Sequence, residues 1–242
     1  MKFSRRLTPF KAISFDLDDT LYSNHPVMQT TAREMEAYFK KELPTLLESS
    51  NDIKTVYDIN FWSPYKQKVL NVKPDLIHDV TVLRVESYTL GLIELGITEV
   101  LAHKTAAKAA AHFDYHRSNF TVPENIHTLL SALAKKYPLI AISNGNVNTQ
   151  SINIEQYFSA TYHAGGQYKQ KPATDMFTRA LEHLNINANE LLHVGDCGKA
   201  DILGGKIAGC QTAWVSSFNI GKPLSVLPTI ELSDVVELHK LL

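Results

Sequence analysis

Near the N-terminus stands the stretch Ala12-Ile13-Ser14-Phe15-Asp16-Leu17-Asp18-Asp19-Thr20, in which an apolar run leads directly into three acids. A short apolar run of this kind predicts a buried strand. Carboxylates at the mouth of a buried strand are unfavourable unless a cation neutralises them, and a divalent metal ion is the natural candidate. The simpler interpretation is an acidic turn that caps the following helix, because Asp and Thr both favour such positions.

Three further stretches favour the metal-site interpretation. Residues 140–145 read IAISNG, an apolar run that ends in a hydroxyl group and turn-forming residues. Lys171 and Pro172 lie in a glycine-containing loop that precedes a helical pattern. Residues 191–201 read LLHVGDCGKAD, a second apolar strand that ends in Asp196, with Asp201 five positions further on. Four short motifs in this order are hard to obtain by chance.

The second half of the chain alternates between strand and helix patterns. After Phe120, a capping box from Thr121 to Glu124 is expected to start a helix. Gly209 is expected to end the last helix of the alternation. This alternation predicts an α/β fold, a Rossmann-like parallel sheet with helices packed on its faces. The expected strands are 138–142, 159–163, 191–194 and 211–215, and the expected later helices are 175–184 and 201–208.

The stretch from residue 23 to residue 118 has a different texture, because its apolar residues recur with helical period. Leu76, Val80 and Leu83 share one face of a predicted helix, and Thr98 is expected to cap an alanine-rich helix that runs to His112. We therefore expect an inserted all-helical domain at residues 23–118, with residues 1–22 and 119–242 forming the α/β core.

The parallel sheet predicts where the acids meet. The carboxyl ends of parallel strands lie at one edge of the sheet, so Asp16, Ser143 and Asp196 are expected in one crevice. Taken in order, the four motifs resemble the haloacid dehalogenase-like (HAD) hydrolase superfamily over residues 15–201 and on into the 209–215 strand. The resemblance implies that the helical insert is a cap domain. It also implies that Asp16 attacks phosphorus to form an aspartyl-phosphate, while Asp18 protonates the leaving oxygen and then activates water.

The same resemblance implies a phosphate-binding set. Ser143 would hydrogen-bond a phosphoryl oxygen, helped by the backbone N–H groups of Asn144 and Gly145. Lys171 would neutralise the charge that develops on the phosphoryl group and would restrain the nucleophile. Lys169 is the competing lysine, but Lys171 is the one followed by the proline that the superfamily motif carries.

The resemblance also implies a magnesium site. Asp16, the backbone carbonyl of Asp18, and Asp196 would hold Mg²⁺, and Asp201 would ligate or orient the ion from nearby. Carboxylate and carbonyl oxygens suit Mg²⁺, and no soft ligand set favours zinc. Cys197 departs from the pattern, because many members carry an acid or Ser after the Gly-Asp pair; a small filler is the favoured interpretation, and a thiol sensitive to oxidation or to soft metals is the alternative.

Other polar and aromatic residues have simpler interpretations. His193 is expected to be a strand histidine with a satisfied hydrogen bond rather than a metal ligand. Arg84 is expected on a solvated helix face, with a phosphate or ring contact as the alternative. A set of aromatic residues is expected in the core of the helical insert rather than on a substrate platform: Tyr22, Trp62, Tyr65 and Tyr88.

Composition limits the classes of function. The 242 residues carry a net charge of −1 and 44% hydrophobic residues, which is typical of a globular protein and gives no basic excess for nucleic acid or a membrane surface. No stretch has the length of a membrane span or the apolar core of a signal peptide, so a cytoplasmic location is expected. The expected partner is a small phosphorylated metabolite, and the oligomeric state, monomer or dimer, stays open.

The expected activity is phosphomonoester hydrolysis. Asp18 separates phosphotransferases from the dehalogenases of the superfamily, whose halide leaving group needs no proton. Overall likeness is to bacterial HAD phosphatases that act on 5-amino-6-(5-phospho-D-ribitylamino)uracil and flavin mononucleotide in riboflavin biosynthesis. The alternatives are a sugar-phosphate mutase of the same fold and a non-catalytic protein that binds a phosphorylated ligand.

Overall fold

The computed structural model describes residues 1–47, 56–218 and 220–242. The chain divides into two compact units, one formed by Met1–Asn24 with Thr121–Leu242 and the other by His25–Phe120. We call the first the α/β unit and the second the helical unit. Residues 48–55 of the expected helical insert lie outside the described residues.

The α/β unit is built on a seven-stranded sheet of order β1-β7-β6-β5-β2-β3-β4. The edge strand β1 pairs antiparallel with β7, and the other neighbouring strands pair in parallel. The predicted α/β fold with a parallel sheet is therefore confirmed. The strands are β1 (Lys2–Phe3), β2 (Ala12–Phe15), β3 (Leu139–Ser143), β4 (Ala160–His163), β5 (Leu191–Gly195), β6 (Gln211–Val215) and β7 (Ile230–Leu232).

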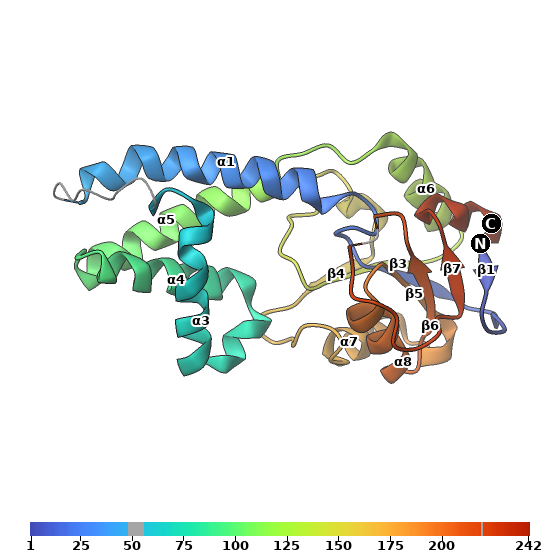
Figure 1. Ribbon diagram of the computed structural model, residues 1–242. Helices are drawn as coiled ribbons and strands as arrows, with labels where there is room; N and C mark the ends of the chain where they lie inside the picture. Colours follow the sequence, from blue (N-terminus) through green and yellow to red (C-terminus); the bar gives the residue numbers. More distant parts are fainter. Residues whose placement is uncertain (48–55, 219) are drawn as a thin grey trace. The chain divides into compact units, whose positions relative to one another are not determined.

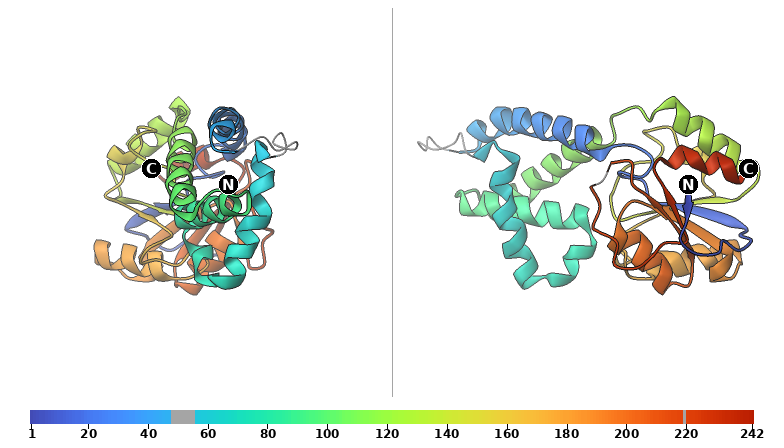
Figure 2. Two further views of the ribbon diagram at one scale, coloured as in Figure 1. Left: turned by 90° about the vertical axis from the view of Figure 1, so that its left-hand side faces the viewer. Right: turned by 45° about the vertical axis from the view of Figure 1, so that its right-hand side comes forward.

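Helices cover both faces of this sheet, which explains why β2, β3 and β5 consist of buried residues throughout. Helix α6 (Glu124–Ala134) and the C-terminal 3₁₀-helix (Val235–Leu241) lie on one face (Figures 1 and 2). Helices α7 (Asp175–Leu184) and α8 (Gly204–Ile207) lie on the other. On that face Phe177 and Ala180 of α7 pack against Ile140 and Ile142 of β3.

The helix observed in this region differs from the one predicted at 201–208. It begins earlier, as a π-helical turn over Gly198–Leu203, and becomes α-helical only in α8. The backbone carbonyl of Cys197 accepts hydrogen bonds from the N–H groups of both Asp201, at 2.9 Å, and Ile202, at 3.2 Å, which widens this first turn. Gly209, with φ of 85°, follows the helix as expected.

The prediction of a capping box at the start of α6 is wrong. Pro123 occupies the N-cap position with φ of −58° and makes no side-chain capping bond, and Glu124 is the first residue of the helix. The ring of Pro123 fixes the backbone there, so the chain enters the helix without the hydroxyl cap. Strands β1 and β7 had no counterpart among the predicted strands.

The helical unit is an assembly of helices around an aromatic core. Phe39, Trp62 and Tyr88 are at most 3% exposed, and the Phe39 and Trp62 ring centroids lie 4.9 Å apart. Gly91 makes this packing possible, because a Cβ there would lie 2.7 Å from a carbon of the Trp62 ring. The described α-helices include α1 (Asn24–Glu42), α3 (Ser63–Val72), α4 (Val80–Glu94) and α5 (Glu99–Arg117), with 3₁₀ turns at Leu43–Thr45, Ile59–Trp62 and Pro74–His78.

Several details of the helical insert differ from expectation. Helix α5 continues beyond His112 to Arg117, and Thr98 is its N-cap but makes no side-chain capping bond. Trp62, Tyr65 and Tyr88 pack in the aromatic core as expected, whereas Tyr22 is buried in the α/β unit.

The prediction that Arg84 lies on a solvated helix face is wrong. Its side chain is only 18% exposed, lies 3.5 Å from the Phe113 ring centroid and pairs with Asp114 at 3.3 Å. An arginine can bury its stem on an aromatic face while its guanidinium keeps a charged partner.

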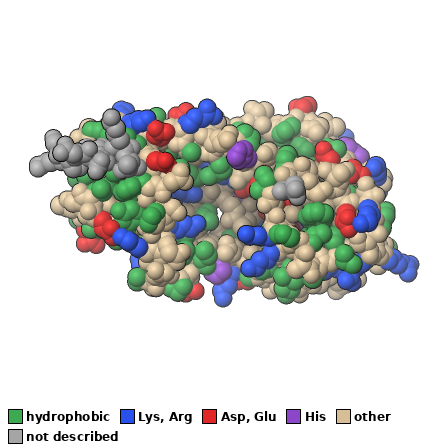
Figure 3. Space-filling view, in the orientation of Figure 1, with side chains coloured by type: hydrophobic (Ala, Val, Ile, Leu, Met, Phe, Trp, Pro, Cys, Tyr) green, Lys and Arg blue, Asp and Glu red, His purple; other side chains and the backbone are tan. Residues whose placement is uncertain are grey.

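The surface carries charges of both signs. In the space-filling view, basic side chains lie among acidic ones on the face shown (Figure 3). Among the described residues, no helix combines the length and the apolar character that crossing a membrane requires.

Candidate active site

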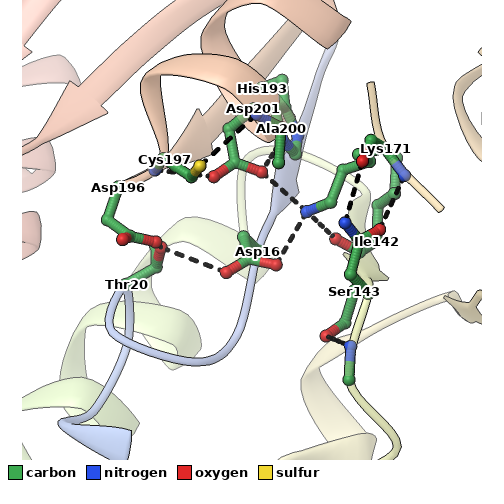
Figure 4. A network of polar contacts seen from close by, with 12 residues as sticks. Asp16, Thr20, Ile142, Ser143, Lys171, His193, Asp196, Cys197, Ala200 and Asp201 are labelled. Carbon is green, nitrogen blue, oxygen red and sulfur yellow. Dashed lines mark hydrogen bonds and ion pairs between the residues drawn. The ribbon is translucent and has the colours of Figure 1, made fainter. Parts of the chain in front are cut away.

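The parallel strands bring distant residues of the α/β unit to one place (Figure 4). The central strand β2 lies between β3 and β5, with Phe15 beside Ala141 and Val194. Asp16, Ser143 and Asp196 are therefore each the last residue of a strand or the first after one, at the same edge of the sheet. The structure brings together at this edge the three residues that the sequence places there.

Lys171 lies at the centre of the polar network. Its ammonium nitrogen is 2.7 Å from Asp16 Oδ1, 2.7 Å from Asp201 Oδ1 and 2.6 Å from the carbonyl oxygen of Ile142 (Figure 4). The side chain is 1% exposed. Burial alone lowers the pKa of Lys171, but the charges of Asp16 and Asp201 outweigh it, so its pKa lies above the ordinary value and the ammonium stays charged.

Asp201 is held by donors on both carboxylate oxygens. Oδ1 accepts from Lys171 and, at 3.2 Å, from Nε2 of His193, and Oδ2 accepts from the Cys197 N–H at 2.9 Å. Burial raises the pKa of Asp201, yet the Lys171 charge and the His193 hydrogen bond bring it below the ordinary value. Asp201 is therefore ionised, with one lone pair left on Oδ2.

His193 has the buried, satisfied position that the sequence predicts. Burial lowers its pKa, so the ring is neutral. Because Nε2 faces the Asp201 carboxylate, this nitrogen carries the proton, and Nδ1 accepts from the Ser14 hydroxyl at 2.9 Å. A hydrogen-bonded chain thus runs from β2 through β5 to Asp201.

Asp16 and Asp196 carry pKa values shifted in the opposite direction to Asp201. Burial, followed by the charges of Asp201 and Asp196, raises the pKa of Asp16 well above its ordinary value, against the opposing charge of Lys171. Burial and the charges of Asp201 and Asp19 raise the pKa of Asp196 to about 7. One oxygen from each of Asp16, Asp196 and Asp201 lies within 4.8 Å of the others. This cluster has more carboxylate than Lys171 alone can neutralise.

Thr20 connects two of these acids. Its hydroxyl lies 3.2 Å from Asp196 Oδ1 and 3.5 Å from Asp16 Oδ2, and the residue is fully buried. The sequence shows Thr20 within the acidic motif but does not show which atoms its hydroxyl contacts. Trp214 was also missed: its indole N–H donates to the backbone carbonyl of Asp196 at 2.7 Å.

The loop that carries Lys171 is tied to the end of β3. The Asn144 side chain donates to the Lys171 carbonyl at 3.0 Å and accepts from the Lys171 N–H at 2.7 Å. The N–H of Gly145 donates to Ser143 Oγ at 3.0 Å, so this N–H has a local partner. Lys169 is exposed, whereas Lys171 reaches Asp16.

Asp18 is not a member of the cluster of three carboxylates. It is half-buried in the loop that follows β2, next to Asp19, whose φ is 57°. Its backbone forms an isolated bridge with Tyr22. The N–H groups of Thr20 and Leu21 donate to the Leu17 carbonyl, so residues 16–20 form a compact loop.

Gly195 is needed for the position of Asp201. A Cβ on Gly195 would lie 2.3 Å from the carboxyl carbon of Asp201. The sequence signal was present in the Gly-Asp pair, but the neighbour that requires the missing side chain becomes visible only once the π-helical turn folds back.

The helical unit, taken by itself, contains a cavity of about 280 Å³. Trp62 lies in its wall, and the indole N–H is buried with no hydrogen-bond partner among the described residues. Burial raises the pKa of Tyr88, also in the wall, to about 12. The positive charge in the lining of this cavity comes from Lys66 and Arg84. The lining includes Met28, Ile59, Trp62, Lys66, Val80, Leu83, Arg84, Tyr88 and Phe113.

Comparison with known proteins identifies the family that this fold and this acidic edge define. A family model described as haloacid dehalogenase-like hydrolase matches residues 10–209. The chain belongs to the haloacid dehalogenase-like hydrolases, as the four motifs predicted.

Individual relatives narrow the likeness. The chain is 34% identical, over the full length of both proteins, to the 5-amino-6-(5-phospho-D-ribitylamino)uracil phosphatase YigB of Escherichia coli K12, so the expected likeness to this group is confirmed. It is 26% identical to a glyceraldehyde 3-phosphate phosphatase of Pyrococcus abyssi, over 96% of this chain and 90% of that protein. A 2-haloacid dehalogenase structure from Pseudomonas syringae, 23% identical, aligns with a TM-score of 0.85 over 96% of this chain and 97% of that one, a likeness of fold.

Proposed function

We propose that this protein is a magnesium-dependent phosphomonoesterase that works through an aspartyl-phosphate on Asp16. The observation that carries the proposal is the 2.7 Å contact between Lys171 Nζ and Asp16 Oδ1 at the carboxyl edge of the sheet. A buried ammonium beside a carboxylate keeps one oxygen oriented while the other is available for attack. Full-length likeness to a phosphatase supports the same reaction class.

The donor set fits a hard divalent cation. Asp16 and Asp196 both have raised pKa values in the protein alone, which means that added positive charge is what their surroundings favour. The oxygens of Asp16 and Asp196, the backbone carbonyl of Asp18 and the free lone pair on Asp201 Oδ2 would hold Mg²⁺. When bound, Mg²⁺ would supply positive charge for the phosphoryl oxygens and for the Asp16 and Asp196 carboxylates.

The protein's own residues would carry the bond changes. An Asp16 oxygen forms a bond to phosphorus as the ester P–O bond breaks, and the Asp18 carboxylic acid gives its proton to the departing alkoxide. The resulting Asp18 carboxylate then takes a proton from water, whose oxygen attacks phosphorus and releases phosphate and Asp16. Asp18 lies two residues from the nucleophile in the compact loop after β2, so both groups act from one segment.

Ser143 and Lys171 would stabilise the phosphoryl group. The Ser143 hydroxyl accepts from the Gly145 N–H, which leaves its own proton to donate to a phosphoryl oxygen. Lys171 is fixed by three contacts before substrate arrives, so its charge needs no reorganisation during the reaction. The backbone N–H of Asn144 completes the proposed phosphate-binding set.

The substrate class we propose is a phosphate ester that bears a nitrogen heterocycle, such as 5-amino-6-(5-phospho-D-ribitylamino)uracil or flavin mononucleotide. YigB, the full-length relative, is named for the first of these esters. The cavity of the helical unit, taken by itself, has a largely apolar lining that includes Arg84 and Lys66, and it would suit a planar ring with electron-rich edges. In this proposal residues 1–22 and 119–242 are the catalytic core, and residues 23–118 are a cap that selects the substrate.

The test is phosphate release from a panel of esters, with Mg²⁺ and with a chelator in its place. The panel holds flavin mononucleotide, the ribitylaminouracil phosphate, nucleotides, sugar phosphates and glycerol phosphate. We expect Mg²⁺-dependent release with the highest kcat/KM for the two heterocyclic esters. Equal rates across the panel would overturn the substrate class but leave the phosphatase, and no release would overturn both.

Two variants separate the roles. Asp16→Asn is expected to abolish turnover while the far-ultraviolet circular dichroism stays that of the wild type, because the amide keeps the shape of the side chain but is no nucleophile. Arg84→Met is expected to raise KM for flavin mononucleotide more than KM for glycerol phosphate. An Arg84→Met enzyme whose selectivity is unchanged would exclude the cavity from ring recognition.

A further inference from the structure

A second cluster of metal-ligating side chains lies in the helical unit. His112 and His116 are four residues apart on α5 and therefore project from the same face of that helix. Glu34, on α1, faces them: its Oε2 is 4.0 Å from His116 Nε2. One ring nitrogen of each histidine and one carboxylate oxygen of Glu34 all lie within 4.8 Å of one another.

One ring nitrogen of His112, a member of this cluster, makes no hydrogen bond with the described residues. This nitrogen is Nε2, and it is buried. The ring is hydrogen-bonded to the backbone of Glu34, and because Nε2 has no partner, this bond belongs to Nδ1. The ring also stacks on Tyr38, with centroids 4.6 Å apart, and meets the His116 ring at 4.5 Å.

A buried polar atom without a partner destabilises a fold, so such atoms are uncommon and usually have a reason. The arrangement of His112 is the one that metal-binding histidines adopt: one nitrogen donates to a backbone carbonyl, which fixes the ring, and the other presents its lone pair to the ion. The stacked Tyr38 ring restrains the same orientation from its face.

From these contacts we infer that His112, His116 and Glu34 form a binding site for a divalent transition-metal ion of the zinc class, which ties α1 to α5. Two imidazoles and one carboxylate are a ligand set that Zn²⁺ prefers and that Mg²⁺ does not. The all-oxygen cluster at Asp16 has the opposite preference. The two sites therefore differ in the chemistry of the ion that each takes.

The present spacing is close to what such an ion needs. Ligand atoms about 2.0 Å from a tetrahedral ion lie roughly 3.3 Å from each other. The 4.0 Å gap between Glu34 and His116 therefore has to close by about 0.7 Å, and no gap in the set by more than about 1.5 Å. Glu34 is 46% exposed and can supply that movement by rotation of its side chain, and His116, 16% exposed, leaves the cluster open to ions from solvent.

The experiment measures Zn²⁺ binding to the full-length protein by equilibrium dialysis in the presence of excess Mg²⁺. Co²⁺ serves as a spectroscopic probe, because a four-coordinate nitrogen-containing site gives strong visible absorption. The variants are His112→Gln, His116→Gln and Glu34→Gln. His103→Gln is the matched control, since His103 is an exposed histidine on the same helix.

We expect the wild type and His103→Gln to bind one equivalent of Zn²⁺, to give the visible Co²⁺ spectrum and to melt at a higher temperature with Zn²⁺. Loss of either histidine should weaken binding at least about tenfold and remove the spectrum. His116 is 16% exposed, so replacing it is expected to disturb the packing of the helix less than replacing His112, whose Nε2 is buried. Wild-type protein without this equivalent, or His116→Gln protein that keeps its affinity and spectrum, would overturn the site.

Discussion

Replacing Lys171 with methionine would leave Asp16 and Asp201 facing each other without the ammonium that now lies 2.7 Å from both. Methionine has nearly the volume of lysine, so the change removes charge and donors rather than packing. The site is buried, with the lysine side chain 1% exposed, so water cannot take over the three contacts. The variant therefore isolates the electrostatic contribution of one side chain.

The magnitude follows from the contacts. Hydrogen bonds to charged groups contribute about 1.5–3 kcal/mol each, and Lys171 donates three, two of them to carboxylates. Protonation of one carboxylate in the variant limits the loss. Measured values for removing one partner of a buried ion pair are about 3–5 kcal/mol, and we expect the free energy of unfolding to fall by that amount.

The assay is urea unfolding near neutral pH with a chelator present, on the wild type, Lys171→Met, Asp201→Asn and the double variant. Asp201→Asn removes one of the two orphaned charges, so it should destabilise the Lys171→Met protein at least about 1 kcal/mol less than it destabilises the wild type. Phosphatase activity of Lys171→Met should fall by about 10²–10³, as for other preorganised donors. A loss of stability under about 1 kcal/mol, or additive effects in the double variant, would refute the central role of this ammonium.

Three other changes have expected outcomes. Gly195→Ala should abolish phosphatase activity, measured with any accepted ester, because its Cβ would lie 2.3 Å from the carboxyl carbon of Asp201. Gly91→Ala should lower the free energy of unfolding by about 1–3 kcal/mol, seen as a lower urea midpoint, despite the better helix propensity of alanine. The reason is that the added Cβ would meet the Trp62 ring at 2.7 Å. An unchanged midpoint would mean that the ring moves aside freely. The pKa of Asp196, raised from 3.8 to about 7, makes the folded metal-free protein bind more protons than the unfolded chain, so this group's contribution to stability falls as pH rises from about 4 to 7. Mg²⁺ favours the ionised form, so the increase in melting temperature that Mg²⁺ produces should grow from about pH 5 to about pH 8, and an increase independent of pH would contradict the assignment.

The sequence predicted those parts of the fold that local patterns specify. β2, β3 and β5 are apolar runs that end in polar residues, and the alternation with helices identified the parallel sheet. Strands β1 and β7 were not predicted, because strands of two and three residues are too short to show a periodic pattern. Their pairing joins Lys2 to Glu231, which lie near opposite ends of the sequence. The π-helical turn was not predicted, because it depends on a tertiary contact, the fit of Asp201 over Gly195.

The candidate site shows the same division. The sequence identified the residues that the sheet brings to one edge, because strand ends are local features. It missed how Thr20 and Trp214 attach to Asp196, since a hydroxyl or an indole in a motif does not say which atom it will meet. Arg84 was misjudged because helical period alone does not reveal that a neighbouring helix places Phe113 under the guanidinium.

The hydrogen bond between Ser14 and His193 has a consequence for folding. These residues are direct partners in the parallel pairing of β2 with β5. A shift of either strand by one residue would turn its side chains to the opposite face and leave an imidazole and a hydroxyl buried without partners. Apolar strands can tolerate such a slip, because one aliphatic side chain replaces another. The polar pair makes the misaligned sheet unfavourable. The hydrogen bond therefore fixes the register of β2 against β5, and this register aligns Asp16 with Asp196 before any substrate is present.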